Sequence, residues 1–279
     1  MTALAVAVSG HGLVDPTEPV IRADDEALGR GRAVFETLRV YGGVPFRLAQ
    51  HLDRLVRSAA FVGIQEPDVA ELDRLAAIAL SAAGAQDAVL RLYWTPGPPD
   101  GDPVAVALVT DLPSWVEPAR AGGQRLLSLL SPRRSAPWLL AGTKSTSYAA
   151  HVAAELEAKR RGFDDALFVD ADGVVLEGPV TNIWWRVGRT LYTPGLELGI
   201  LAGETRAALM ELAAERRYGV VEGAFPLDAV LRDADEAFTS SSVREVMPVV
   251  AIDERRFERG SAADELQAAL RQLAVTPPT

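Results

Sequence analysis

Apolar positions recur along most of the chain with a period of either two or three to four residues, which predicts alternating strands and helices. The run at 47–61 shows the helical period clearly, because Leu48, Leu52 and Leu55 fall on one face. In the first part of the chain the pattern predicts strands at 3–9, on both sides of Gly42-Gly43, at 87–95 and at 102–110, and helices at 47–61 and 67–83.

The second part continues the alternation without a strict βαβ repeat, which favours two α+β domains over a doubly wound sheet. The segment DLPSWVEPARAGG contains three turn-forming breaks and is interpreted as a connection, so we expect domains at 1–112 and 124–279 joined by a linker at 113–123. The expected elements of the second domain are a strand at 124–130, a helix at 146–161, hairpins at 165–178 and 182–194, a strand at 236–241, and helices at 203–217, 226–232 and 261–273.

Composition excludes several classes of function. The 279 residues carry a net charge of −10 and no basic cluster, so we expect neither nucleic acid nor an anionic membrane as a partner. Cysteine is absent, which rules out disulfides and thiolate catalysis, and the three histidines lack ligand spacing, so we expect no metal site. No apolar run reaches the roughly 20 residues that span a bilayer. The opening has no basic region before its apolar run, so we expect a cytoplasmic protein.

Lysine is rare in this chain. Of the 28 basic residues only Lys144 and Lys159 are lysines. Lysine, unlike arginine, can lose its proton and attack a carbonyl group to form an imine. Lys159 follows Glu155 by one helical turn, as in an ordinary surface pair, whereas Lys144 lies among small residues in AGTKSTSY. Lys144 is therefore a candidate nucleophile, with a surface-loop lysine as the alternative.

Three further stretches have the chemistry that pyridoxal phosphate requires. Glu177 lies at a Gly-Pro bend after a strand, where a carboxylate can keep a pyridine nitrogen protonated; the alternative is an exposed strand-end glutamate. GILAGETR opens a helix at Glu204 and Thr205, and N–H groups at the start of a helix can hold an anion. TSSSVRE offers hydroxyl groups and closely spaced amides after a strand. Each signal is weak alone, but with Lys144 they predict a pyridoxal-phosphate site.

The sequence resembles the class IV (fold type IV) pyridoxal-phosphate aminotransferases, a family that includes branched-chain aminotransferases, D-amino acid transaminases and aminodeoxychorismate lyases. The motifs are AVFETLRVYGGVPFRLAQHLDRL, AGTKSTSY, GFDDALFVDADGVVLEGPVTNIWW, LYTPGLELGILAGETR and EAFTSSSVREVMPV, and they extend over about 24–252. The resemblance implies a small N-terminal α+β domain, a larger C-terminal domain with the cofactor between them, and a homodimer.

The resemblance also implies roles for particular residues. Lys144 matches the Schiff-base lysine and Glu177 the acid that pairs with the pyridine nitrogen, and Asn182 is counted among the cofactor-binding residues. Arg54 matches the arginine that binds the phosphate; the alternative is an ordinary helix-surface arginine. The remaining matches to cofactor contacts are Glu204, Thr205, Ser240 and Ser241 for the phosphate and Tyr148 for the phenolic oxygen.

The chain departs from the family at the substrate carboxylate. Branched-chain enzymes usually read FEG where this chain has FET, which disfavours that assignment. The D-amino acid enzymes place a tyrosine at the position of Phe35 and an Arg-x-His pair in the loop after the strand of Arg91, and the lyases carry an arginine-bearing run there. This chain has only TPGPPDGDP. We therefore expect Arg30, with Arg91, to bind the carboxylate through a bidentate pair; the alternative places Arg30 in solvent or in an interface salt bridge.

The leading hypothesis is a transaminase that moves an amino group from a D-amino acid, or an (R)-amine, to a 2-keto acid such as 2-oxoglutarate or pyruvate. The SSSVREVMPV run is closer to the D-amino acid branch than to the lyases. The main alternative is aminodeoxychorismate lyase, which releases pyruvate and 4-aminobenzoate, and a branched-chain aminotransferase is less favoured. A non-catalytic pyridoxal-phosphate carrier is the remaining alternative, and the presence of Lys144, Glu177 and Arg54 argues against it.

Overall fold

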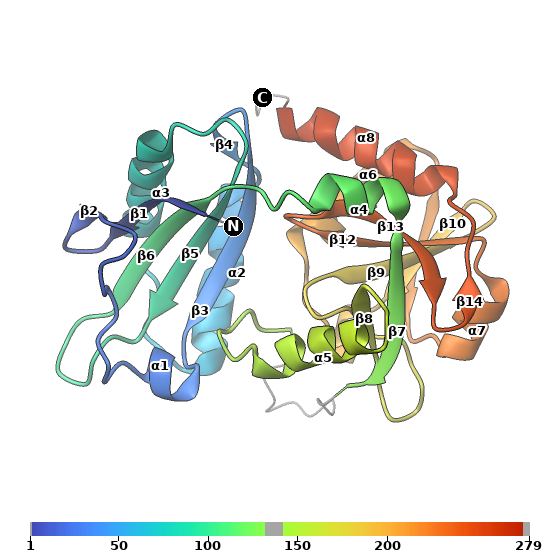
Figure 1. Cartoon of the computed structure of the whole chain (residues 1–279), viewed down its shortest axis with the longest axis horizontal. Coiled ribbons are helices and arrows are strands. Elements are labelled where there is room, and N and C mark those ends of the chain that lie inside the picture. The colour runs from blue at the N-terminus through green and yellow to red at the C-terminus, as the bar shows by residue number, and fades with distance from the viewer. Residues whose placement is uncertain (1, 132–141, 276–279) are drawn as a thin grey trace. The chain divides into compact units, whose positions relative to one another are not determined.

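The computed structural model describes residues 2–131 and 142–275, and the chain divides into two compact units (Figure 1). Unit 1 consists of Met1–Pro113 and Thr143–Tyr148, and unit 2 of Ser114–Gly142 and Ala149–Thr279. Most of the expected linker at 113–123 is occupied by helix α4 (Val116–Gly122), which belongs to unit 2. The segment around Lys144 belongs to unit 1, although the chain on both sides of it belongs to unit 2.

Unit 1 is built on a six-stranded sheet with the order β2-β1-β6-β5-β3-β4, in which every neighbouring pair is antiparallel. Its strands are β1 (Ala3–Val8), β2 (Gly12–Val14), β3 (Val34–Tyr41), β4 (Val44–Pro45), β5 (Ala88–Thr95) and β6 (Val104–Thr110). Its helices are α1 (Glu26–Arg30), α2 (Leu48–Val62) and α3 (Val69–Ala83).

Helices α2 and α3 pack against strands β1, β3 and β6 and close the core of unit 1. Leu52 and Leu55 of α2, and Leu72 and Leu75 of α3, are almost fully buried in this core. Each such leucine stabilises the unit by roughly 1.5–3 kcal/mol through removal of its side chain from water. This burial explains why the helical period of the apolar residues predicts both helices well.

Unit 2 is built on an eight-stranded mixed sheet with the order β11-β10-β9-β12-β13-β7-β8, to which β14 adds by pairing with β13 (Figure 1). Its strands are β7 (Gln124–Leu130), β8 (Asp165–Val169), β9 (Asn182–Val187), β10 (Thr190–Pro194), β11 (Gly219–Gly223), β12 (Glu236–Ser241), β13 (Glu245–Ile252) and β14 (Arg255–Arg256). Its helices are α4, α5 (Ala149–Arg160), the 3-10 helix η1 (Leu196–Leu198), α6 (Glu204–Glu215), α7 (Leu227–Asp233) and α8 (Ser261–Val275).

Several elements of unit 2 differ from the expectation, and β11, β14 and η1 were not among the expected elements. Strand β13 was not predicted either, and it lies between β12 and β7 in the sheet. The second arm of the expected hairpin at 165–178 is present but irregular: Val175 bridges to Val169, and the N–H groups of Leu176 and Phe168 donate to the carbonyl oxygens of Phe168 and Glu177. Helix α5 begins at Ala149 and not at 146, because the residues before it pair with unit 1.

Within the part of the chain that the structure describes, no helix is both long enough and apolar enough to cross a bilayer. The same residues contain no group of three or more histidine, aspartate or glutamate side chains placed to hold a metal ion.

Candidate active site

The segment that carries Lys144 extends the edge of unit 1 at the start of β3. Ser145 forms a bridge with Val34, and the Phe35 N–H donates to the Lys144 carbonyl oxygen at 3.1 Å. On the other side the Thr146 N–H donates to the Ala33 carbonyl oxygen at 2.9 Å. These bonds place Lys144 beside Phe35 although the two are far apart in the sequence.

The Lys144 amine lies against aromatic rings. Its Nζ is 4.4 Å from the centroid of the Phe35 ring, 5.8 Å from that of Tyr148 and 3.5 Å from the Tyr148 hydroxyl oxygen. The Phe35 ring in turn stacks on Tyr93, with centroids 5.8 Å apart, and meets Tyr148 edge-on at 5.2 Å. Lys144, Tyr148 and Phe35, which the sequence analysis selected for separate reasons, thus come together in unit 1.

Arg91 shares a sheet face with Phe35. Phe35 pairs with Tyr93, and Thr37 pairs with Arg91, so the alternation of side chains along a strand puts all four on one face. The Arg91 Nη1 donates to the Thr110 hydroxyl at 3.1 Å.

Arg30 lies elsewhere in unit 1, as the last residue of α1. Its side chain is 75% exposed, and its Nη1 is 3.5 Å from the Glu26 carboxylate one helical turn earlier. In this chain, therefore, the Arg30 guanidinium is a solvent-exposed group with a local partner.

Arg54 is buried in a cluster with Glu36 and His51. Its Nε and Nη2 donate to the two oxygens of the Glu36 carboxylate at 2.7 and 2.6 Å, a bidentate pair. His51 Nδ1 lies 2.6 Å from the same carboxylate. Burial alone would raise the pKa of Glu36, but the charges and hydrogen bonds of Arg54 and His51 outweigh it and lower the pKa to about 2. Glu36 is therefore ionised and fixes the direction of the Arg54 guanidinium.

The sequence analysis missed Glu36 and His51. Glu36 lies between Val34 and Leu38 on the inward side of β3, and both neighbours are fully buried. A charged residue at an inward strand position needs a buried partner, and this is the signal that would have selected it. His51 and Arg54 are three positions apart in α2, so they are neighbours on one helix face.

In unit 2 Glu177 is held by two donors. The Leu201 N–H donates to Glu177 Oε2 at 3.0 Å, and the Asn182 side-chain amide donates to the same oxygen at 3.3 Å. Asn182 also donates to the Leu201 carbonyl oxygen at 2.9 Å. Hydrogen bonds to the ionised form favour it, so this arrangement suits a carboxylate that stays charged.

The start of α6 lies next to Asn182. Gly203 is the N-cap residue, and a Cβ atom at this position would lie only 2.1 Å from the Asn182 Oδ1. The first turn of a helix presents N–H groups that lack partners within the helix and favours a negative charge. Glu204 and Thr205, which follow directly, are both buried.

The serine turn, here Ser240–Arg244, begins on the other side of Asn182. Ser240 pairs with Asn182 across β12 and β9, and its hydroxyl oxygen accepts a hydrogen bond from Trp184 Nε1 at 3.0 Å. The Ser241 hydroxyl accepts from the Arg244 N–H at 3.3 Å. Asn182 therefore joins Glu177, the start of α6 and the serine turn within unit 2.

Each of the two units contains groups that fit pyridoxal phosphate. Unit 1 provides a lysine amine among aromatic rings and an arginine whose direction is fixed. Unit 2 provides an oriented carboxylate beside a helix start whose N-cap glycine lies close to the Asn182 side chain. An amine for the carbonyl group, a carboxylate for the ring nitrogen and N–H groups for the phosphate are what the cofactor needs.

Comparisons with known proteins agree with this chemistry. The family described as amino-transferase class IV matches residues 33–252. The chain is 32% identical to a bifunctional aminodeoxychorismate lyase / D-amino acid transaminase of Mycobacterium tuberculosis, over 94% of this chain and 95% of that protein.

Two solved structures have the same fold. A hypothetical aminotransferase from Mycobacterium tuberculosis in its PLP-bound form matches with a TM-score of 0.91 at 31% identity, covering 97% of this chain and 99% of the other. A fold IV transaminase from Curtobacterium pusillum matches with a TM-score of 0.89 at 33% identity, covering 99% and 100%. The chain therefore belongs to the class IV aminotransferases and is a pyridoxal-phosphate-dependent enzyme with the α+β architecture of fold type IV.

Proposed function

We propose that this enzyme is a transaminase that moves an amino group from a D-amino acid to a 2-keto acid such as 2-oxoglutarate or pyruvate, with (R)-amines as a second class of donor. The observation that carries the chemistry is the position of the Lys144 amine, 4.4 Å from the centroid of the Phe35 ring and 3.5 Å from the Tyr148 hydroxyl. The choice of D-amino acids rests on the SSSVREVMPV run and on the name of the Mycobacterium tuberculosis relative.

In this proposal Lys144 moves the proton. The bound cofactor supplies an electron sink for the charge that remains when a proton leaves the substrate Cα. Lys144 Nζ would take that proton from Cα and pass it to the C4′ carbon of the cofactor within the same half-reaction, the second half-reaction would run this transfer in reverse, and the Tyr148 hydroxyl would orient the amine. Glu177, held by Leu201 and Asn182, keeps the ring nitrogen protonated.

Each unit contains candidate ligands for the phosphate group. Arg54 supplies a guanidinium whose direction Glu36 sets. The N–H groups at Glu204 and Thr205 supply the positive end of the α6 dipole. Ser240 and Ser241 supply the remaining contacts, in agreement with the register that places Ser240 beside Asn182.

Arg91 is the stronger candidate for the substrate carboxylate, because it shares a sheet face with Phe35, whose ring contacts Lys144. Arg30 is the second candidate, and its exposed guanidinium is free to turn only if it leaves Glu26. Replacing each arginine by methionine and measuring the apparent affinity for amino and keto acids tests the assignment. The arginine whose loss leaves both affinities unchanged is not the carboxylate ligand.

A half-reaction screen tests the transaminase proposal. Each donor is added alone to the loaded enzyme, and the loss of the visible cofactor band is followed with D-alanine, D-glutamate, L-leucine and (R)-1-phenylethylamine. The proposal expects bleaching by the D-amino acids and recovery of the band on addition of 2-oxoglutarate. Bleaching by L-leucine alone would overturn the choice of donor.

Aminodeoxychorismate lyase is the second candidate, and the bifunctional name of the Mycobacterium tuberculosis relative favours it specifically. The lyase uses the same lysine but eliminates pyruvate and leaves 4-aminobenzoate. Pyruvate release from aminodeoxychorismate, compared with transfer from D-alanine to 2-oxoglutarate at equal enzyme concentration, separates the two activities.

The proposal includes a cytoplasmic homodimer, as in the family that the sequence resembles. Light scattering on the purified, cofactor-loaded protein tests the assembly, because a mass equal to one 29.8 kDa chain contradicts the dimer.

A further inference from the structure

The residue that follows the serine turn has an unusual backbone conformation. Glu245, the first residue of β13, has a φ of 54°, in the left-handed region that residues other than glycine rarely adopt. Its carboxylate is fully buried. Backbone strain of this kind persists only where the surroundings hold it, and it clusters at functional sites.

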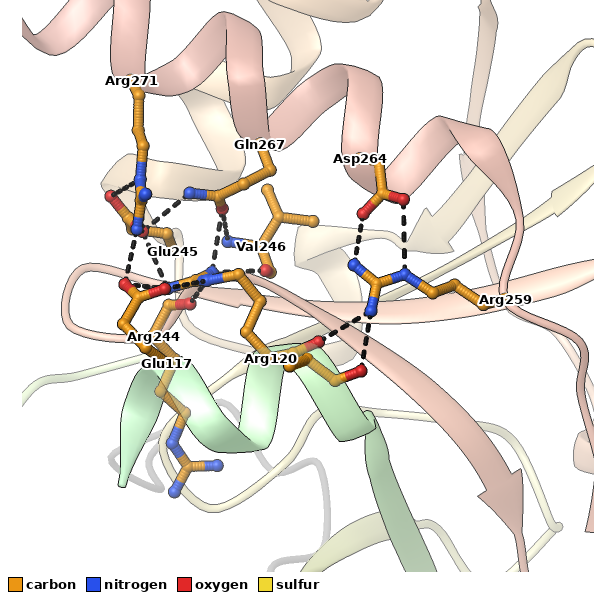
Figure 2. Close-up of polar contacts among 10 residues, drawn as sticks. Glu117, Arg120, Arg244, Glu245, Val246, Arg259, Asp264, Gln267 and Arg271 are labelled. Carbon is orange, nitrogen blue, oxygen red and sulfur yellow. Dashed lines mark hydrogen bonds and ion pairs between the residues drawn. The ribbon is translucent and has the colours of Figure 1, made fainter. Parts of the chain in front are cut away.

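The carboxylate of Glu245 is bound by side chains of α4 and α8 (Figure 2). Its Oε2 lies 2.8 Å from Arg120 Nη2 and accepts from the Gln267 amide at 2.7 Å and from Arg271 Nη2 at 2.9 Å. Arg120 is itself 7% exposed, so this ion pair is shielded from water. In a buried ion pair each charge needs the other to offset the hydration that it has lost, so the two groups keep a defined geometry.

Arg120 and Gln267 also bind the backbone on both sides of Glu245. Arg120 Nη1 donates to the carbonyl oxygens of Arg244 at 2.8 Å and of Val246 at 2.6 Å. The Gln267 side-chain oxygen accepts from the Val246 N–H at 2.9 Å and from Arg120 Nη1 at 2.9 Å. Three consecutive residues, Arg244 of the serine turn and Glu245 and Val246 of β13, are therefore held by two side chains from outside the sheet.

The pairing of β12 with β13 connects these restrained residues directly to Ser240 and Ser241. Ser241 pairs with Glu245, and Ser240 pairs with Val246, in the antiparallel ladder of β12 and β13. The Arg244 N–H also donates to the Ser241 hydroxyl. A shift of the backbone at 244–246 therefore moves the amides and hydroxyls of Ser240 and Ser241 with it.

We propose that Arg120, Gln267 and Glu245 are positioning residues that hold the serine turn in the conformation that binds the cofactor phosphate. The inference rests on the proposed phosphate role of Ser240 and Ser241. It assigns a function in cofactor binding to α4 and the C-terminal helix α8, through side chains that do not themselves touch the cofactor.

The test compares pyridoxal phosphate with pyridoxal, which lacks the phosphate. Dissociation constants of both are measured by titration of the visible band in the full-length protein, for the wild type, Arg120→Met and Glu245→Gln. Because pyridoxal has no phosphate to contact the serine turn, a positioning role alters only the first constant.

Arg259→Met is the matched control. Arg259 also joins this region to α4, since its Nη1 donates to the carbonyl oxygens of Arg120 and Ala121 at 3.0 Å and it pairs with Asp264 at 2.6 Å (Figure 2). None of these contacts involves residues 244–246. We expect both constants of this variant to stay within about twofold of the wild type, as for other exposed pairs.

For Arg120→Met the dissociation constant of pyridoxal phosphate is expected to rise about tenfold, a size typical for the loss of a hydrogen bond to a charged group. The constant of pyridoxal is expected to stay within about twofold. Glu245→Gln keeps the shape of the side chain and should raise the first constant by about threefold.

Equal rises for both ligands, or an unchanged pyridoxal-phosphate constant in a folded variant, would overturn the inference. If Arg120→Met does not fold, as judged by circular dichroism, Glu245→Gln decides by the same criteria. A wild type that binds pyridoxal phosphate no more tightly than pyridoxal contradicts the proposed roles of Ser240 and Ser241 themselves. If the wild type binds pyridoxal phosphate more tightly than pyridoxal and the variants keep the same preference, only the positioning role is contradicted.

Discussion

Lys144 combines a reactive group with a fixed backbone. Hydrogen bonds with Phe35 and Ala33 hold the main chain at Lys144 and Thr146, while the Lys144 side chain lies along the rings of Phe35 and Tyr148. Aromatic faces attract an ammonium group and also accommodate a neutral amine. A lysine amine at this position can act as a nucleophile, which an arginine side chain cannot.

Lys144→Arg is expected to give a folded protein that shows no visible band of a covalently held cofactor, because a guanidinium does not form an imine at neutral pH. Absorption spectra with pyridoxal phosphate and circular dichroism are the measurements. Lys159→Arg is the matched control, since Lys159 is the other lysine of the chain and is exposed at the end of α5. Retention of the band in Lys144→Arg contradicts the assignment of the nucleophile.

Glu36 couples stability to pH. Its pKa is about 2 in the folded protein, below the usual value of 4.5, so the unfolded chain binds more protons between these values and stability rises with pH across that window. The stabilisation is fully present above pH 4.5 and is lost as the pH falls toward about 2.

Glu36→Gln is expected to lower the free energy of unfolding at pH 7 by about 3 kcal/mol, because Arg54 loses its buried partner. Urea unfolding at a series of pH values measures this difference, which should shrink below pH 4.5 as the wild type takes up its own proton. Glu71→Gln, which breaks an exposed pair with Arg74 in α3, serves as the control and should change stability by less than about 1 kcal/mol. A constant difference across the pH range would show that charge is not the cause.

Among the elements of the candidate site, the first turn of α6 makes a close approach to Asn182. Gly203 is followed by Glu204 and Thr205, and a Cβ atom at this position would lie 2.1 Å from the Asn182 Oδ1 and displace that side chain. Asn182 in turn orients Glu177. A side chain at 203 therefore disturbs the carboxylate and the helix start together.

Gly203→Ala is expected to destabilise unit 2 by about 1–3 kcal/mol through overpacking and to weaken pyridoxal-phosphate binding. Thermal unfolding and titration of the visible band measure the two effects. Gly122→Ala is the control in the same unit, because a Cβ atom on Gly122 meets nothing within 4 Å. If Gly203→Ala binds the cofactor as Gly122→Ala does, the close approach at α6 has no role in the site.

Periodicity predicted the elements that have one buried face and failed where other contacts decide the structure. The helices α2, α3 and α8 are amphipathic and were expected at nearly their observed positions. Strand β13 was missed because Pro248 lies inside it, and a proline lacks the N–H that a central strand uses. The hairpin after β8 was expected and is present, but its second arm is not a regular strand, because Val175 bridges to Val169 of β8 whereas Val174 bridges to Pro226.

The candidate site was predictable only where residue chemistry is unusual by itself. Lys144 stands out because lysine is so rare in this chain, and Phe35 and Tyr148 follow from the family motifs. Glu36 and His51 depend on a contact between β3 and α2, which no local pattern contains. The network around Glu245 depends on α4 and α8, which are far apart in the sequence.

The molecule as a whole is divided by contacts and not by simple sequence order. Unit 1 takes its first 113 residues from the start of the chain and then a short segment, Thr143–Tyr148, from within the second half. Thr146 is bonded to Ala33, 113 residues away. The proposed nucleophile is thus a residue of unit 1 by structure, whatever its position along the chain.

Hydrogen exchange in Glu36→Gln tests whether the segment Thr143–Tyr148 belongs to unit 1. Destabilising unit 1 should accelerate exchange of the Thr146 amide together with the amides of β3, because they open in the same cooperative unit. Amides of α5, which begins only three residues later at Ala149, should exchange as in the wild type. Mass spectrometry of peptides on either side of position 149 measures the difference. Acceleration confined to β3, without Thr146, would contradict the assignment.

The position of the Lys144 segment also sets the order of events during biosynthesis. Unit 1 cannot be completed when residue 113 leaves the ribosome, because the partner of Ala33 is made 113 residues after it. At synthesis rates of about 5–20 residues per second, the 113 residues between Ala33 and Thr146 take roughly 6–20 s to make. During that time the start of β3 presents unpaired N–H and C=O groups. The nascent N-terminal unit is therefore most exposed to mispairing with a neighbouring chain just before it acquires its lysine.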